Sequence, residues 1–114
     1  MDRSKALDAL SALANAQRLD LVRLLMPQGD EGMAAGAIGQ ALGLSASRLS
    51  FHLAALEQAG LIRSRRVARN VIYAADRAGI GGTISFLLAD CCMHHPEVMA
   101  CCTGSRALTL PPAE

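Results

Sequence analysis

Aromatic side chains are scarce in this sequence of 114 residues, which has no tryptophan, one tyrosine and two phenylalanines. A core must therefore be built from aliphatic residues, and the many Ala and Leu residues favour helices. Long apolar runs are also missing, because no stretch approaches the roughly 18 consecutive apolar residues of a membrane-spanning helix. With 52% hydrophobic and 18% charged residues, the composition predicts a folded, mainly helical protein rather than a disordered chain.

Net charge is nearly absent as well, at +1 for the whole sequence, but the charges are unevenly distributed. Residues 45–70 contain five arginines and a single acidic residue, Glu57. A local basic patch on a neutral protein is one signature of nucleic-acid binding, and a solvated charged surface is the simpler alternative. The structural context of these arginines must decide between the two.

Catalytic constellations and targeting signals are also lacking. No set of side chains suits hydrolysis or phosphoryl transfer, and no C-x-x-C motif lies near a βαβ pattern, so the sequence predicts that the protein is not an enzyme. The first five residues lead into an amphipathic segment rather than the apolar run of a signal peptide. We therefore expect a cytoplasmic protein with no membrane partner.

Cysteine is confined to two adjacent pairs near the C-terminus, Cys91–Cys92 and Cys101–Cys102. In a reducing compartment, clustered thiols indicate metal binding or redox chemistry more often than disulfides. Four thiols packed only for structural reasons are the least favoured interpretation. The sequence thus predicts a domain of residues 1–90 followed by a cysteine-containing tail of residues 91–114.

Apolar periodicity predicts five helices, and a turn region at residues 27–32 follows the second of them. The expected helices span residues 3–14, 17–26, 33–42, 46–59 and 77–90. Gly43 suits the left-handed position that ends the third helix, and Ser45 suits the N-cap of the fourth. Two short helices joined by a three-residue turn containing Gly form a helix-turn-helix pattern.

The fourth helix has the features of a DNA-recognition helix. Leu49, Leu53 and Leu56 form its core-facing stripe, and the N-terminal part of such a helix enters the major groove. His52 lies toward the core side, so a packed histidine is slightly preferred over a DNA contact. The predicted DNA-contacting residues of this helix are Ser45, Ser47, Arg48, Ser50, Phe51 and His52.

A β-hairpin is predicted directly after this helix, with strands at residues 61–66 and 70–74. It corresponds to the wing of a winged helix-turn-helix, and its arginines Arg65, Arg66 and Arg69 are expected to contact phosphates. The fold class is therefore mainly α with a small β-hairpin, and the partner is double-stranded operator DNA. In the last helix, Ile80, Ile84, Leu87, Leu88 and Cys91 fall on one stripe, which predicts a homodimer formed through the first and last helices.

Three segments resemble the ArsR/SmtB family of bacterial metal-sensing repressors. They are residues 13–25 (LANAQRLDLVRLL), 41–53 (ALGLSASRLSFHL) and 56–62 (LEQAGLI). The resemblance covers roughly residues 5–90. It implies a dimeric winged-helix repressor that binds its operator when metal-free and releases it when metal binds. Arg48 and Phe51 stand where the family often has Thr and His, so its base preference does not transfer.

The ligand site must also differ from the most familiar family types. The third helix carries no thiol, and the paired Asp and His ligands of the zinc sensors are missing from the last helix. Some arsenic-responsive members place vicinal cysteines after the last helix, and Cys91–Cys92 resembles that variant. The resemblance therefore implies trivalent arsenic (arsenite), and perhaps antimonite, as the inducer.

The candidate ligands are Cys91, Cys92, Cys101 and Cys102, because soft thiolates select soft ions and three thiolates complete the trigonal pyramid of trivalent arsenic. Adjacent residues on a helix diverge by about 100°, so a third thiol must come from the second pair. A turn at Pro96 can bring it back, and Cys101 is the preferred third ligand. The alternatives are zinc or cadmium, held by all four cysteines or by cysteines with His94 or His95, and a redox or persulfide switch.

Overall fold

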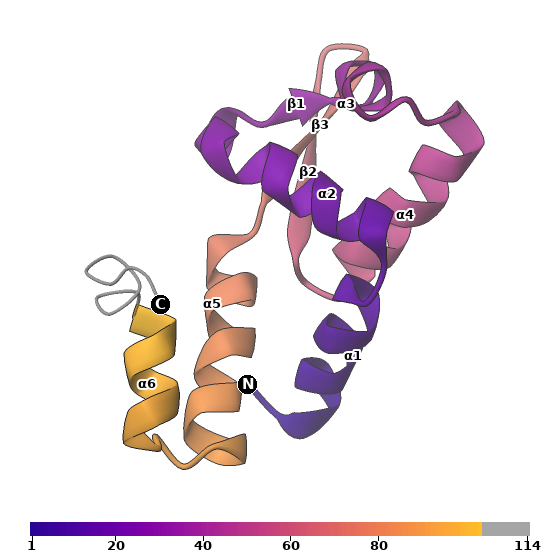
Figure 1. Ribbon diagram of the computed structural model, residues 1–114. Coiled ribbons are helices and arrows are strands. Elements are labelled where there is room, and N and C mark those ends of the chain that lie inside the picture. The colour runs from indigo at the N-terminus through magenta and orange to yellow at the C-terminus, as the bar shows by residue number, and fades with distance from the viewer. Residues whose placement is uncertain (104–114) are drawn as a thin grey trace. The chain divides into compact units, whose positions relative to one another are not determined.

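The computed structural model describes residues 1–103, which fall into two compact units, one ending at Thr83 and the other beginning at Ile84. The first unit contains α1 (Arg3–Leu13), α2 (Ala16–Leu25), the 3₁₀ segment η1 (Met26–Glu31), β1 (Met33–Ala34), α3 (Ala35–Leu42), α4 (Ala46–Gln58), β2 (Ile62–Val67), β3 (Asn70–Ala75) and the start of α5 (Arg77–Phe86) (Figure 1). The second unit contains the end of α5, the π-helical segment η2 (Leu87–Cys91) and α6 (Pro96–Thr103). Part of the predicted tail, residues 104–114, lies outside the described residues. Within residues 1–103, no helix is long and apolar enough to span a membrane.

Side-chain caps begin the first two helices. Asp2 accepts a hydrogen bond from the Lys5 backbone N–H (2.8 Å), and Asn15 accepts one from the Arg18 backbone N–H (3.1 Å); each satisfies a donor that the helix leaves unpaired. On α1 the buried residues are the alanines Ala6, Ala9 and Ala12, whereas Leu7 is 55% exposed. The small side chains let α1 approach the core, and the large apolar side chain of Leu7 is left uncovered.

The helix-turn-helix consists of α3 and α4, as predicted. Gly43 ends α3 in the left-handed conformation (φ +67°), and the Ser45 hydroxyl caps α4 by accepting from the Arg48 backbone N–H. Leu49, Leu53 and Leu56 are all buried. They join a core that also takes leucines from α2, Ile38 from α3, and Leu61 and Ile62 at the entry to β2. This core fixes α4, so its opposite side faces outward.

The predicted wing is confirmed, and the sheet contains a third strand that the sequence did not reveal. Strand order is β1-β3-β2, with all pairs antiparallel. β1 has only two residues, in a segment predicted as helix, and the preceding residues form η1 rather than a plain loop. Gly32 makes the approach possible, because a Cβ there would lie 2.1 Å from the Tyr73 carbonyl oxygen. The β1 pairing ties the base of the wing to the start of α3.

The start of α5 is packed directly onto the turn that follows α4. A Cβ on Gly79 would lie 1.8 Å from the carbonyl oxygen of Gly60, so only glycine permits this approach. The Asp76 carboxylate accepts from the Gly79 backbone N–H (3.0 Å) and so caps this helix. The last helix is thereby anchored to the winged-helix core at its first turn.

The second unit departs from the regular last helix that was predicted. After Phe86 the backbone widens into the π-helical η2, in which the Cys92 N–H donates to the Leu87 carbonyl (2.8 Å). A π-turn shifts the phase of every following residue, so Cys91 does not continue the α-helical stripe of Ile80 and Ile84 as expected. Met93 and His94 then take positive φ angles of 53° each, and α6 begins at Pro96.

Candidate nucleic-acid interface and thiol cluster

The outward side of α4 and its N-terminal turn present the predicted DNA-contacting groups to solvent. Ser45, Ser47, Arg48, Ser50 and Phe51 are all exposed. Their hydroxyl groups and guanidinium can hydrogen-bond to base edges and phosphates, and the aromatic ring can make an apolar contact with the thymine methyl group. The structure thus brings five of the six predicted residues of this helix to one surface.

The sixth, His52, belongs to the interior. It is 6% exposed, and both ring nitrogens have partners, since Nδ1 accepts from Arg18 Nε (3.1 Å) and Nε2 lies 2.8 Å from Gln17 Oε1. Burial, followed by the charges of Arg18 and Arg48, lowers the pKa of His52. Of the two interpretations of this histidine, the packed one is correct.

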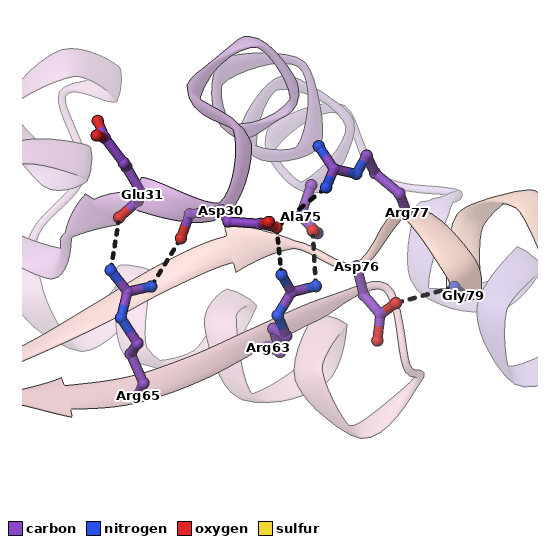
Figure 2. Close-up of polar contacts among 8 residues, drawn as sticks. All are labelled: Asp30, Glu31, Arg63, Arg65, Ala75, Asp76, Arg77 and Gly79. Carbon is purple, nitrogen blue, oxygen red and sulfur yellow. Dashed lines mark hydrogen bonds and ion pairs between the residues drawn. The ribbon is translucent and has the colours of Figure 1, made fainter.

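The wing arginines fall into two groups. Arg65 donates to the backbone carbonyls of Asp30 (2.8 Å) and Glu31 (3.2 Å), so its guanidinium fastens β2 to η1 (Figure 2). Arg66 and Arg69 are exposed, and within residues 1–103 their guanidinium groups make no side-chain hydrogen bond or ion pair. The prediction that all three meet phosphates therefore fits Arg66 and Arg69 better than Arg65, which is a wing anchor.

Asp30 is the centre of this anchoring network. One carboxylate oxygen accepts from Arg63 of β2 (2.5 Å) and from Arg77 at the start of α5 (3.1 Å), and Arg63 also donates to the Ala75 carbonyl (Figure 2). The side chains are half exposed or more, so each pair stabilises the fold by no more than about 1 kcal/mol. The network contributes the orientation of the wing rather than much stability.

The four cysteines are free thiols in the second unit. Cys91, Cys101 and Cys102 are exposed, and Cys92 is half-buried. Hydrogen bonding with Cys91, burial and the nearby thiols of Cys91 and Cys102 together raise the pKa of Cys92. The thiols of the adjacent pair therefore interact, and the Cys102 thiol of α6 contributes to the same shift. The choice of Cys101 as the third ligand stays a prediction.

The thiols do not yet form a complete metal centre. Within residues 1–103 no group of three or more His, Cys, Asp or Glu side chains is arranged to hold a metal ion. One ring nitrogen of His95 is occupied, because Nδ1 accepts from the Glu97 backbone N–H (3.2 Å) and caps α6. Three thiolates would have to move together around a ligand, and the metal assignment stays a prediction.

Two residues of the recognition region were missed by sequence reasoning. Gln17 and Arg18 lie at the start of α2, yet they contact His52 of α4, which is 34 or 35 positions away. The guanidinium carbon of Arg18 lies 5.4 Å from the centroid of the Phe51 ring. No periodicity or local spacing predicts a contact between helices at that separation.

Comparison with known proteins bears on this arrangement. A family model described as a helix-turn-helix domain matches residues 13–65. The transcriptional activator HlyU of Vibrio cholerae is 34% identical over 84 residues, which cover 74% of this chain and 75% of HlyU. The structure of reduced HlyU aligns with a TM-score of 0.61 over 75% of this chain and 86% of that one.

Two further solved structures are similar. The homodimeric winged helix-turn-helix domain Mb0332 of Mycobacterium bovis, a possible ArsR-family regulator, is 29% identical and covers 81% of this chain and 85% of that one, with a TM-score of 0.61. A possible transcriptional regulator for arsenical resistance is also 29% identical. It covers 70% of this chain and 80% of that one, with a TM-score of 0.63.

Proposed function

The chain belongs to the ArsR/SmtB family of winged helix-turn-helix transcriptional regulators, and from this premise we propose that it is an arsenite-responsive repressor. It binds operator DNA as a homodimer and releases the DNA when trivalent arsenic binds the C-terminal thiols. The observation that carries the proposal is the combination of an exposed recognition surface on α4 with a cluster of free thiols beyond α5.

Charge and exposure support the DNA-binding part of the proposal. Arg48 on α4 and Arg66 and Arg69 on the wing are exposed basic groups on two elements that a winged helix-turn-helix applies to DNA. Arg48 can pair with a guanine edge, and the wing arginines can contact phosphates. Arg65 and the Asp30 network hold the wing in place for those contacts.

Exposed apolar side chains support a homodimer. Leu7 on α1 is 55% exposed and Ile84 on α5 is 47% exposed, on the two helices from which the sequence predicts the interface. Mb0332, with the same winged-helix fold, is homodimeric. A dimer presents two copies of α4, which must be about 34 Å apart to enter successive major grooves.

The donor chemistry of the second unit fits trivalent arsenic. Displacement of the three hydroxyls of arsenous acid by three thiols releases three waters and gives a neutral product. The Cys91 and Cys92 thiols already interact, and Cys102 of α6 influences the pKa of Cys92, so the third sulfur would come from the second pair as the thiols rearrange around the ligand. The similarity to a possible regulator for arsenical resistance points the same way.

Coupling between the two parts passes through α5, which starts in the winged-helix unit at Arg77 and leads into η2 and the thiols. A ligand that binds better to one arrangement of this segment shifts the equilibrium between DNA-binding and DNA-free states. A coupling free energy of about 1–3 kcal/mol weakens DNA binding roughly 5- to 150-fold.

The test uses the reduced chain of 114 residues and a DNA duplex that this chain selects from a random library. Fluorescence anisotropy then measures DNA affinity with and without arsenite, and ultraviolet absorption reports thiolate–arsenic bonds. We expect arsenite to weaken DNA binding roughly 5- to 150-fold for the wild type, with no effect on the double variant Cys91→Ser/Cys92→Ser. If arsenite weakens DNA binding by the double variant as much as by the wild type, the site assignment is wrong.

The matched single variants Cys101→Ser and Cys102→Ser identify the third ligand. Cys102 is the thiol of the second pair that affects the pKa of Cys92, so we expect Cys102→Ser to abolish the response and Cys101→Ser to retain it. The reverse result assigns Cys101 instead.

A thiol redox or persulfide switch is the second candidate, favoured by the contact between the Cys91 and Cys92 thiols. Oxidation of two thiols by one peroxide gives a disulfide and two waters, and a rearrangement of the thiols would follow here too. Release of the DNA by peroxide or polysulfide, with arsenite inert, establishes this function. Release by zinc or cadmium alone establishes a metal sensor that uses the same thiols.

A further inference from the structure

Phe51 is the largest apolar group on the exposed side of the recognition helix. Its side chain is 65% exposed although it lies within the first half of α4, among the serines and Arg48. It borders a hollow of about 360 Å³ that opens to solvent between the starts of α2 and α4. The other residues that line this hollow are Asn15, Gln17, Ser47, Arg48 and His52.

Arg18 holds the ring from one side. Its guanidinium carbon lies 5.4 Å from the Phe51 centroid, a cation–π geometry that links α2 to α4. The His52 ring meets Phe51 edge-on, at 5.6 Å between centroids and 63° between planes. An exposed phenylalanine would ordinarily sample several rotamers, and these two neighbours restrict it while leaving most of the ring uncovered.

Arg18 is itself held in place by a partly buried chain of hydrogen bonds. Arginine is always a donor, so its Nε–H requires His52 Nδ1 to be an acceptor. His52 is therefore neutral with its proton on Nε2, which donates to Gln17 Oε1 at 2.8 Å. This chain of hydrogen bonds from Gln17 through His52 to Arg18 fixes the guanidinium over the Phe51 ring.

We infer that Phe51 is a specificity-determining residue that reads the C5-methyl group of a thymine in the operator, with Arg18 and His52 as its positioning residues. The inference rests on the proposed DNA-binding function and extends it to the chemistry of one base. In the major groove the thymine methyl is the apolar feature among the base edges. A preorganised ring meets it without the loss of side-chain freedom that a mobile ring would suffer.

The test replaces thymine by uracil, which removes only the methyl group. The wild-type chain first selects its site from random duplexes, and each thymine of the site is then replaced in turn. We expect one position in each half-site at which uracil weakens binding about fourfold, the effect of one buried methyl-sized group. Phe51→Ala should abolish that thymine/uracil ratio, whereas Leu19→Ala, which removes a comparably exposed apolar side chain from α2, should retain it.

The positioning role is tested by the same ratio. Arg18→Ala should bring the thymine/uracil affinity ratio close to one. Any loss of affinity from the missing charge affects both duplexes equally, and an equal loss does not change the ratio. His52→Asn offers an acceptor near the place of Nδ1 and should retain the ratio, whereas His52→Leu should lose it. Circular dichroism checks that each variant is folded, and if His52→Leu does not fold, Arg18→Ala decides the positioning role.

The outcomes separate this inference from the function on which it rests. If the wild type selects a site but no thymine is discriminated, or if Phe51→Ala discriminates as well as the wild type, the inference is wrong and the repressor proposal stands. The same result, a selected site without thymine discrimination, is expected if Phe51 contacts a partner protein rather than DNA. If no duplex is selected even at low salt, DNA binding itself fails and both proposals fall.

Discussion

The two units of this protein are stabilised in different ways. In the winged-helix unit, thirteen apolar residues are buried in a core shared by four helices and the sheet. In the second unit, by contrast, none of residues 84–102 is buried. A segment with so little burial has low local stability, because hydrophobic burial is the main term that opposes chain entropy. A ligand or a second subunit can therefore change the conformation of the second unit with a modest free energy.

The largest effect is expected from a substitution that separates α5 from the winged-helix core. Gly79→Ala places a Cβ 1.8 Å from the Gly60 carbonyl oxygen, so the backbone must move, at a cost of about 3 kcal/mol. Urea denaturation measures the loss. Gly81→Ala is the control in the same helix, where nothing lies within 4 Å, and it should stabilise by up to about 1 kcal/mol. Equal effects of the two substitutions would contradict the close approach.

A change of pH should have a smaller effect on the free energy of unfolding, and this effect should arise from His52 in the first unit. The pKa of His52 is lowered in the folded state. As pH falls below about 6.5, His52 therefore becomes protonated in the unfolded chain before it does so in the folded chain. The stability that neutral His52 contributes is therefore complete above pH 6.5 and declines until pH passes the lowered pKa. Thermal unfolding between pH 7.5 and 5.5 should show a steeper decline for the wild type than for His52→Asn. Parallel curves would mean that His52 does not titrate differently on folding.

The smallest effect on stability is expected in the second unit. Cys91→Ser/Cys92→Ser changes one exposed and one half-buried thiol, so the free energy of unfolding should change by less than about 0.5 kcal/mol. The urea midpoint of the reduced protein checks this. A loss above 1 kcal/mol would show that the thiols contribute to packing, and the contrast between the two units would fail.

Most of the DNA-binding fold could be predicted because its signals are local. The cap at Ser45, the left-handed Gly43 and the spacing of Leu49, Leu53 and Leu56 each involve residues within a few positions of one another. The hairpin strands were likewise predicted to within a residue or two, since adjacent strands and their turn are read from one short segment. Family resemblance then added the regulator class that the comparisons bear out.

Long-range contacts account for what the sequence did not reveal. β1 has two residues and exists only because β3 lies beside it. The contact of Arg65 with carbonyls of η1, which are 34 and 35 positions away, was not predicted from the sequence. The π-turn that moves Cys91 out of phase also has no simple sequence signature, because it alters a single hydrogen-bond step in an otherwise helical pattern.

Residue patterns along the chain were enough to predict a winged helix-turn-helix with a basic, serine-rich recognition helix and two cysteine pairs beyond it. Which of those residues contact one another depends on the tertiary fold. The fold places Arg18 over Phe51, buries His52 against both of them, and engages the exposed Arg65 with the backbone of η1. The physical reason is that periodicity and capping depend on neighbours in the chain, whereas side-chain partners between helices depend on how the whole core packs.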